Sequence, residues 1–157
     1  MTPTLPPLMA VLSSALGWLL WSVGVGALAN RLPAPWLARS RTLWKRPWPE
    51  TLQSYERRWA IRRWKPWLPD AGNALPNGVA KASLVSRDRR NLERLVLETR
   101  RAELVHLALW LFWIVTALWL PPVGVLINLG FATVFNLPCL WVQRYNRLRL
   151  QRLLGKG

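Results

Sequence analysis

The sequence has few cysteines, histidines and acidic residues, and each shortage disfavours one kind of structure. Cys139 is the single cysteine in 157 residues, so an intramolecular disulfide is impossible. His106 is the single histidine, which disfavours the kind of metal centre that repeats a Glu-x-x-His motif. No Lys or Arg precedes Arg31, so the apolar segment near the N-terminus lacks the basic region with which a signal peptide begins.

Apolar and basic residues, by contrast, are abundant. Hydrophobic residues make up 52% of the chain, 12 residues are Trp, and 22 Lys and Arg against 7 acidic residues give a net charge of +15. Such a charge is typical of nucleic-acid-binding proteins. However, 17 of the 22 basic residues lie between Arg31 and Arg101 and the other 5 follow Gln143, a segregation that favours an anionic membrane surface. We therefore expect membrane lipid as a partner and no nucleic acid.

Three apolar stretches predict an all-α membrane protein that forms a single domain over residues 1–157. Residues 8–29 carry no charge and are long enough, at about 1.5 Å per residue, to cross a hydrocarbon core of roughly 30 Å. Two consecutive prolines divide the second apolar block into residues 104–120 and 123–142. Because paired prolines end a helix, we expect these two segments to form a hairpin of spanning helices.

The positive-inside rule allows one orientation of these spans. Basic residues concentrate in the region 31–101 and in the tail 143–157, so both are expected on the cytoplasmic side of the inner (plasma) membrane, with the N-terminus outside. Trp alternates with Arg and Lys through the first of these regions, which predicts a segment at the membrane interface. Within it, residues 50–64 are expected to form a helix on the membrane, and residues 88–101 a helix that continues into the second span.

The only histidine marks the candidate catalytic centre. His106 lies two residues inside the second span, where an ionisable group is a functional candidate by default. Glu103 lies one helical turn before it, close enough to fix the imidazole tautomer while the ring accepts a proton from a hydroxyl. Counting from the proline turn places Asn136 at the depth of His106, and Gln143 shares the helix face of Asn136. We expect a polar pocket at the inner interface, with Glu98 in contact with substrate or with a neighbouring Arg.

Less specific interpretations remain open. Glu103 and His106 can form an interfacial ion pair without a catalytic role, and Asn136 and Gln143 can be ordinary interhelical hydrogen-bond partners. A divalent metal could use Glu103 and His106 with Asp70 and Glu98 as further oxygen ligands. That motif occurs once, so we expect no metal cofactor.

Four segments, taken in order, resemble one known family. They are Arg63-Trp64-Lys65, Glu98-Thr99-Arg100-Arg101-Ala102-Glu103-Leu104 followed by His106, Asn136-x-Pro138, and Gln143-Arg144-Tyr145-Asn146-Arg147-x-Arg149-Leu150. Together they make the chain similar to the glycosyl-4,4'-diaponeurosporenoate acyltransferase family over nearly its whole length. The two longer motifs are specific in combination.

The resemblance implies a membrane enzyme of carotenoid biosynthesis that esterifies a sugar hydroxyl of a glycosylated carotenoid with a fatty acyl chain, towards staphyloxanthin-like pigments. His106 and Glu103 would be catalytic, and acyl-CoA would be the co-substrate. The alternative is a noncatalytic membrane subunit that binds lipid or scaffolds the enzymes of a pigment pathway, and the oligomeric state is left open. Residues expected to contact acceptor, donor phosphates or developing negative charge are Trp64, Lys65, Asp70, Glu98, Arg100, Arg101, Asn136, Gln143, Arg144, Tyr145, Asn146 and Arg147.

Overall fold

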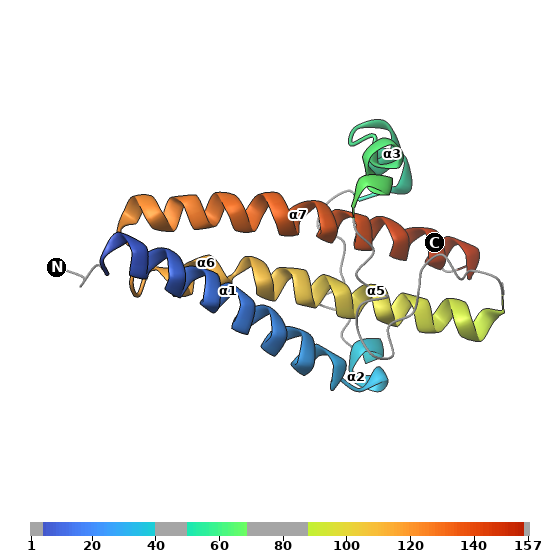
Figure 1. Cartoon of the computed structure of the whole chain (residues 1–157). Coiled ribbons are helices and arrows are strands. Elements are labelled where there is room, and N and C mark those ends of the chain that lie inside the picture. Colours follow the sequence, from blue (N-terminus) through green and yellow to red (C-terminus); the bar gives the residue numbers. More distant parts are fainter. Residues whose placement is uncertain (1–4, 40–49, 69–87, 156–157) are drawn as a thin grey trace. The chain divides into compact units, whose positions relative to one another are not determined.

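The computed structural model describes residues 5–39, 50–68 and 88–155. In these residues all regular structure is helical, which confirms the predicted all-α class (Figure 1). The elements are α1 (Pro7–Asn30), α2 (Ala34–Arg39), α3 (Leu52–Arg57), α4 (Ile61–Trp64), the 3-10 turn η1 (Lys65–Trp67), α5 (Arg89–Trp110), α6 (Phe112–Thr116) and α7 (Pro122–Leu153).

The chain divides into two compact units. Unit 1 comprises Met1–Leu32 and Glu103–Leu140, and unit 2 comprises Pro33–Ala102 and Trp141–Gly157. Helices α5 and α7 each contribute residues to both units. Unit 1 therefore contains the predicted spans except Trp141 and Val142, and unit 2 contains the basic region from Pro33 on together with the basic tail.

Among the described residues, α1 and α7 are the two helices long and apolar enough to cross a membrane. Only 6% of the apolar window of α1 and 11% of that of α7 is buried, so their large side chains face outward. A core helix of a soluble protein would bury them, whereas a lipid environment can surround an apolar surface of this extent. The exposed side chains include Leu19 and Val23 on α1 and Ile127 and Phe135 on α7. These observations support membrane association.

The segment 104–120, predicted as a further span, is not one continuous helix. The helix predicted over 88–101 is present as α5 and continues into the apolar block as expected, but it ends before a turn at Leu111, and α6 is short. Around α6 the backbone bonds shift to the tighter i to i−3 pattern, as in the bond from the Ile114 N–H to the Leu111 carbonyl at 3.1 Å. The start of a new helix at the paired prolines is confirmed. Helix α7 begins at Pro122, where a missing N–H does not cost a helix bond, and it continues through most of the basic tail.

Tryptophan side chains link the helices of unit 1. An indole N–H without a partner is costly in an apolar environment, and four of these donors are matched to an acceptor on another segment. The bonds run from Trp18 Nε1 to Asn128 Oδ1 at 2.9 Å, Trp21 Nε1 to the Ala108 carbonyl at 2.9 Å, Trp110 Nε1 to Thr133 Oγ1 at 3.1 Å, and Trp119 Nε1 to Ser14 Oγ at 3.1 Å. For these four residues the observed role is interhelical bonding rather than anchoring at a headgroup layer.

Gly17 allows α1 to approach α6 closely. A Cβ atom at this position would lie 2.8 Å from Cζ of Phe112, which is closer than side-chain contacts allow. The Phe112 ring is buried and meets the Trp18 ring edge to face, with centroids 4.8 Å apart. Small residues at helix crossings serve this purpose in membrane proteins.

The helix predicted over residues 50–64 is broken, and this part of the prediction was wrong. Between α3 and α4, Ala60 has φ 46° and ψ 36°, a left-handed conformation that a continuous right-handed helix cannot contain. The change of direction buries Ile61 completely. Its apolar cluster stabilises the break and consists of Tyr55, Ile61, Val142, Tyr145 and Leu148.

Candidate functional site

His106 and Asn136 contact each other within unit 1. His106 Nδ1 on α5 lies 3.3 Å from Asn136 Oδ1 on α7, so the depth register counted from the proline turn is confirmed. The Asn136 Nδ2 donates to the Ala132 carbonyl at 3.0 Å, which directs Oδ1 towards the imidazole. Because an amide oxygen only accepts, a hydrogen bond here requires the proton on Nδ1, and in a neutral ring the lone pair is then on Nε2. This is the tautomer that lets Nε2 accept a proton from a substrate.

Glu103, the other predicted catalytic residue, is buried, with 4% of its surface exposed. Carboxylates are rarely buried to this degree, so its environment is unusual for an acidic residue. Its proposed hydrogen bond to His106 stays a prediction. Gln143 is also buried and belongs to unit 2.

Unit 2 contains a cavity of about 580 Å³ between η1, α5 and α7. This volume is within the range of roughly 300–1,000 Å³ that small-molecule sites occupy. Apolar side chains, mainly leucines, form part of its wall. Its polar and charged lining residues are Arg62, Lys65, Glu98, Thr99, Tyr145, Asn146 and Arg149. The cavity therefore gathers four residues that the sequence assigned to substrate: Lys65, Glu98, Tyr145 and Asn146.

Tyr145 is the centre of the basic side of this cavity. It is 1% exposed, and its hydroxyl donates to Glu56 Oε1 at 2.9 Å and accepts from Arg62 Nε at 3.3 Å. Lys65 Nζ lies 5.5 Å from the centre of its ring, and the Arg149 guanidinium carbon lies 5.7 Å from it. Cations at these distances are attracted by the negative face of an aromatic ring. One tyrosine thus holds three cationic side chains close together.

Polar contacts fix two of these cations further. Lys65 Nζ donates to Asn146 Oδ1 at 2.6 Å, and Arg62 forms an ion pair with Glu56 at 2.7 Å. The hydrogen bond to the Tyr145 oxygen, together with the Glu56 charge, raises the pKa of Arg62 above its ordinary value. Arg62 is therefore positively charged at neutral pH.

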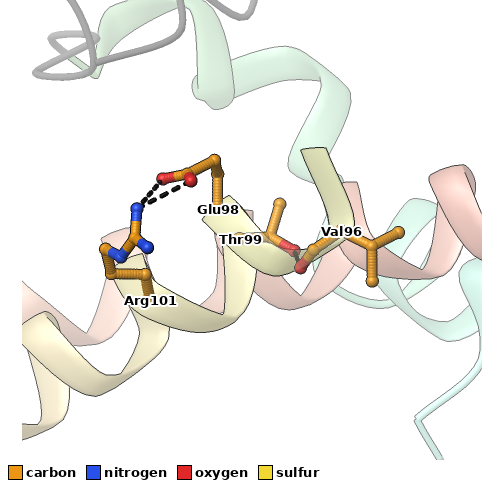
Figure 2. A network of polar contacts seen from close by, with 4 residues as sticks. All are labelled: Val96, Glu98, Thr99 and Arg101. Atoms are coloured by element: carbon orange, nitrogen blue, oxygen red, sulfur yellow. Dashed lines mark hydrogen bonds and ion pairs between the residues drawn. The ribbon is translucent and has the colours of Figure 1, made fainter. Parts of the chain in front are cut away.

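Glu98 is paired with Arg101 on the same helix. One guanidinium nitrogen, Nη1, lies 2.7 Å from each carboxylate oxygen of Glu98, as Figure 2 shows. Beside this pair, the buried Thr99 hydroxyl donates to the Val96 carbonyl at 2.7 Å. Glu98 was expected to contact either substrate or a neighbouring Arg, and in the structure it contacts Arg101.

Two further arginines that the sequence assigned to substrate make contacts that hold unit 2 together. Arg100 Nη1 donates to the Leu37 carbonyl at 2.7 Å, in the last turn of α2, where helix carbonyls lack intrahelical partners. Arg144 Nη1 lies 2.7 Å from Glu50 Oε1, and both side chains are mostly buried. Arg147 is buried and lies outside the cavity lining. Substrate binding by these residues stays a prediction.

Trp64 and Asp70 are the last two residues that the sequence assigned to substrate. The Trp64 indole donates to the Trp59 carbonyl at 2.8 Å, and its ring packs against the apolar cluster of Tyr145. Asp70 lies outside the described residues.

In the described ranges there is no group of three or more His, Cys, Asp or Glu side chains that could hold a metal. The expectation that the protein needs no metal remains to be tested.

Arg62 and Arg149 line the cavity but were not among the site residues predicted from the sequence. Arg149 follows Tyr145 by four positions on α7, so helical spacing alone could have placed it beside the ring. Arg62 had no such signal, because its position depends on the left-handed conformation of Ala60, and an alanine does not predict that conformation.

A family model and individual relatives of this chain carry the same description. The family model described as glycosyl-4,4'-diaponeurosporenoate acyltransferase matches residues 33–156. A protein of that name from Staphylococcus aureus (strain MRSA252) is 29% identical over 140 residues, which cover 87% of this chain and 83% of the relative. The protein of that name from Staphylococcus aureus (strain Newman) is 28% identical over the same shares of the two chains. No solved structure matches.

Proposed function

The chain belongs to the glycosyl-4,4'-diaponeurosporenoate acyltransferase family, and from this premise we propose that it transfers a fatty acyl group from acyl-CoA to a sugar hydroxyl of a glycosylated carotenoid. Family membership supports the reaction class and the type of acceptor. The observation that supports the mechanism is the contact from His106 Nδ1 to Asn136 Oδ1, because a neutral ring that donates from Nδ1 accepts a proton at Nε2.

In the proposed mechanism His106 is the general base. Nε2 accepts the proton of the sugar hydroxyl as that oxygen attacks the thioester carbonyl carbon, so a C–O bond forms and the C–S bond then breaks. The thiolate leaves and takes a proton from the imidazolium, which restores the neutral ring. The products are the ester and the free thiol of CoA. Asn136 holds the ring, and Glu103 stabilises the imidazolium charge.

The proposal includes a membrane topology with three spans and an outer N-terminus. Residues 104–120 form the second of these spans despite their interrupted helix, because His106 is their only ionisable side chain. We would test this by replacing Cys139 with Ser and introducing single cysteines, Val123→Cys and Arg152→Cys, for labelling by a maleimide that cannot cross the membrane. The first should react in intact cells and the second only after lysis. The reverse pattern would exclude this orientation.

His106→Ala provides the direct test of the mechanism. Membranes that contain the full chain are supplied with a glycosylated carotenoid and labelled acyl-CoA, and the extracted pigments are analysed by mass. We expect ester formation to fall at least about 100-fold, as loss of a general base does. Leu107→Ala is the matched control, since Leu107 is the next residue on α5 and is exposed. Full turnover by the His106 variant would instead favour the alternative of a noncatalytic membrane subunit.

A further inference from the structure

The cavity of unit 2 presents an excess of positive charge. Among the described residues, Arg62, Lys65 and Arg149 line it, and Glu98 is the one acidic residue that does so. The Glu98 carboxylate is already bonded to Arg101 through both oxygens. The cavity therefore suits an anionic ligand group better than a neutral one.

Two of these cations are held in place by neutral groups. Lys65 contacts the Asn146 amide oxygen and lies 5.5 Å from the Tyr145 ring centre, and Arg149 lies 5.7 Å from the same centre. These contacts restrict the positions of the two cations. A ligand anion thus meets donors that are already ordered, which lowers the entropy cost of binding.

The rest of the cavity wall is apolar and extends along α5 and α7. Leu95 comes from α5, and Val142, Leu150 and Leu153 come from α7. A small hydrophilic anion would leave this surface unused. A ligand that joins a charged group to a hydrocarbon chain would use both sides of the cavity.

We propose that this cavity binds the acyl donor, with Lys65 and Arg149 on the phosphate of its phosphopantetheine arm and the leucine-lined wall on the acyl chain. This inference rests on the proposed function, because an acyltransfer enzyme needs a site for an activated acyl group. A fatty acyl thioester of phosphopantetheine combines a phosphate with a hydrocarbon chain. The phosphate matches the cationic side of the cavity, and the chain matches its apolar wall. Arginine and lysine are the side chains that proteins use for phosphate.

The test is direct binding to the full chain in nanodiscs of zwitterionic lipid. The probes are three unreactive thioethers with the same palmityl chain, which carry CoA, 4'-phosphopantetheine or pantetheine without phosphate. We expect the two phosphorylated probes to bind at least about tenfold more tightly than the third. Lys65→Gln and Arg149→Gln should each weaken binding of the phosphorylated probes about fivefold and leave the phosphate-free probe unchanged.

Controls separate a charge effect from a structural one. Lys65→Arg should restore most of the phosphate preference. Arg152→Gln removes an exposed cation of α7 that does not line the cavity, and it should bind all three probes as the unmodified chain does. Equal affinity for all three probes, or an equal loss of all three in the Lys65 and Arg149 variants, would overturn the inference.

The same preparations distinguish failure of this inference from failure of the proposed function. If the unmodified chain forms the ester but shows no phosphate preference, the donor site lies elsewhere and the acyltransferase function stands. If it binds the phosphorylated probes but forms no ester, the binding site stands and the proposed function fails. Acyl transfer from acyl-CoA and from acyl carrier protein, compared at equal concentration, identifies which carrier supplies the phosphopantetheine thioester.

Discussion

Asn136 orients the imidazole of His106 by accepting from Nδ1 at 3.3 Å while its own amide nitrogen is held by the Ala132 carbonyl. The backbone of α7 thus determines which way the amide faces, and the amide oxygen favours the tautomer with the proton on Nδ1. In catalytic triads the residue that orients the histidine can be an asparagine as well as a carboxylate.

Removal of the Asn136 amide should lower the rate of acyl transfer. We expect Asn136→Ala to reduce kcat about tenfold to a hundredfold without a comparable rise in the KM for the donor, because the ring loses its tautomer preference but the donor site is unchanged. Asn136→Asp keeps an acceptor opposite Nδ1 and should retain more activity. Asn128→Ala is the control, since it removes another α7 amide, the partner of Trp18. An unchanged kcat for Asn136→Ala would exclude the orienting role.

Gly17 and Gly24 should respond in opposite ways to the same substitution. A Cβ at Gly17 would lie 2.8 Å from Phe112, whereas one at Gly24 meets nothing within 4 Å. We expect Gly17→Ala to destabilise unit 1 by about 1–3 kcal/mol through overpacking. Gly24→Ala should be neutral or stabilising, because glycine is a poor helix former. Thermal unfolding of the two variants in one detergent, followed by circular dichroism, makes the comparison; equal Tm values would contradict the close packing.

Ala60→Gly should stabilise the protein. A left-handed backbone costs an ordinary residue roughly 1–2 kcal/mol and glycine almost nothing, and the greater freedom of glycine in the unfolded chain offsets part of this gain. We expect a net gain of about 0.5–1 kcal/mol, seen as a higher Tm. Ala60→Val should lower the Tm, and Ala102→Gly, within the regular helix α5, should lower it too. A lower Tm for Ala60→Gly would mean that the turn is not left-handed in the folded protein.

The Arg144 and Glu50 pair should act on stability rather than on donor binding. The two groups are 2.7 Å apart with 23% and 18% of their side chains exposed. In a double-mutant cycle with alanine at each position we expect a coupling energy of about 1 kcal/mol. The reversed pair, Arg144→Glu with Glu50→Arg, should recover part of the lost stability. A raised donor KM for Arg144→Ala with no change in Tm would assign Arg144 to substrate binding instead.

Chelation of divalent metal should leave the reaction rate unchanged. The proposed mechanism uses an imidazole base and needs no Lewis acid. Membranes treated with EDTA and then assayed for ester formation should match untreated membranes within about twofold, which is below the effect of losing a catalytic group. A large loss that Mg²⁺ or Mn²⁺ restores would revive the metal interpretation of Glu103 and His106.

Local sequence signals predicted the features that depend on short stretches of chain. The paired prolines predicted the start of α7, and their position gave the register that brings His106 opposite Asn136. The helical pattern over 88–101 predicted α5. Each of these follows from backbone geometry within one or two turns, or from counting residues on both sides of a turn.

The sequence by itself thus determined the helical class, the family and the lone histidine as the candidate base. Tertiary structure decided where helices break and which cations share a cavity. Burial of Ile61 against Val142 and Leu148 accompanies the left-handed turn at Ala60. Tyr145 brings together Arg62 and Lys65, which lie about 80 residues earlier in the chain, and Arg149, which lies one helical turn later. The physical reason is that local propensity differences are of the order of 1 kcal/mol, whereas burial of side chains from distant segments contributes more and selects the final arrangement.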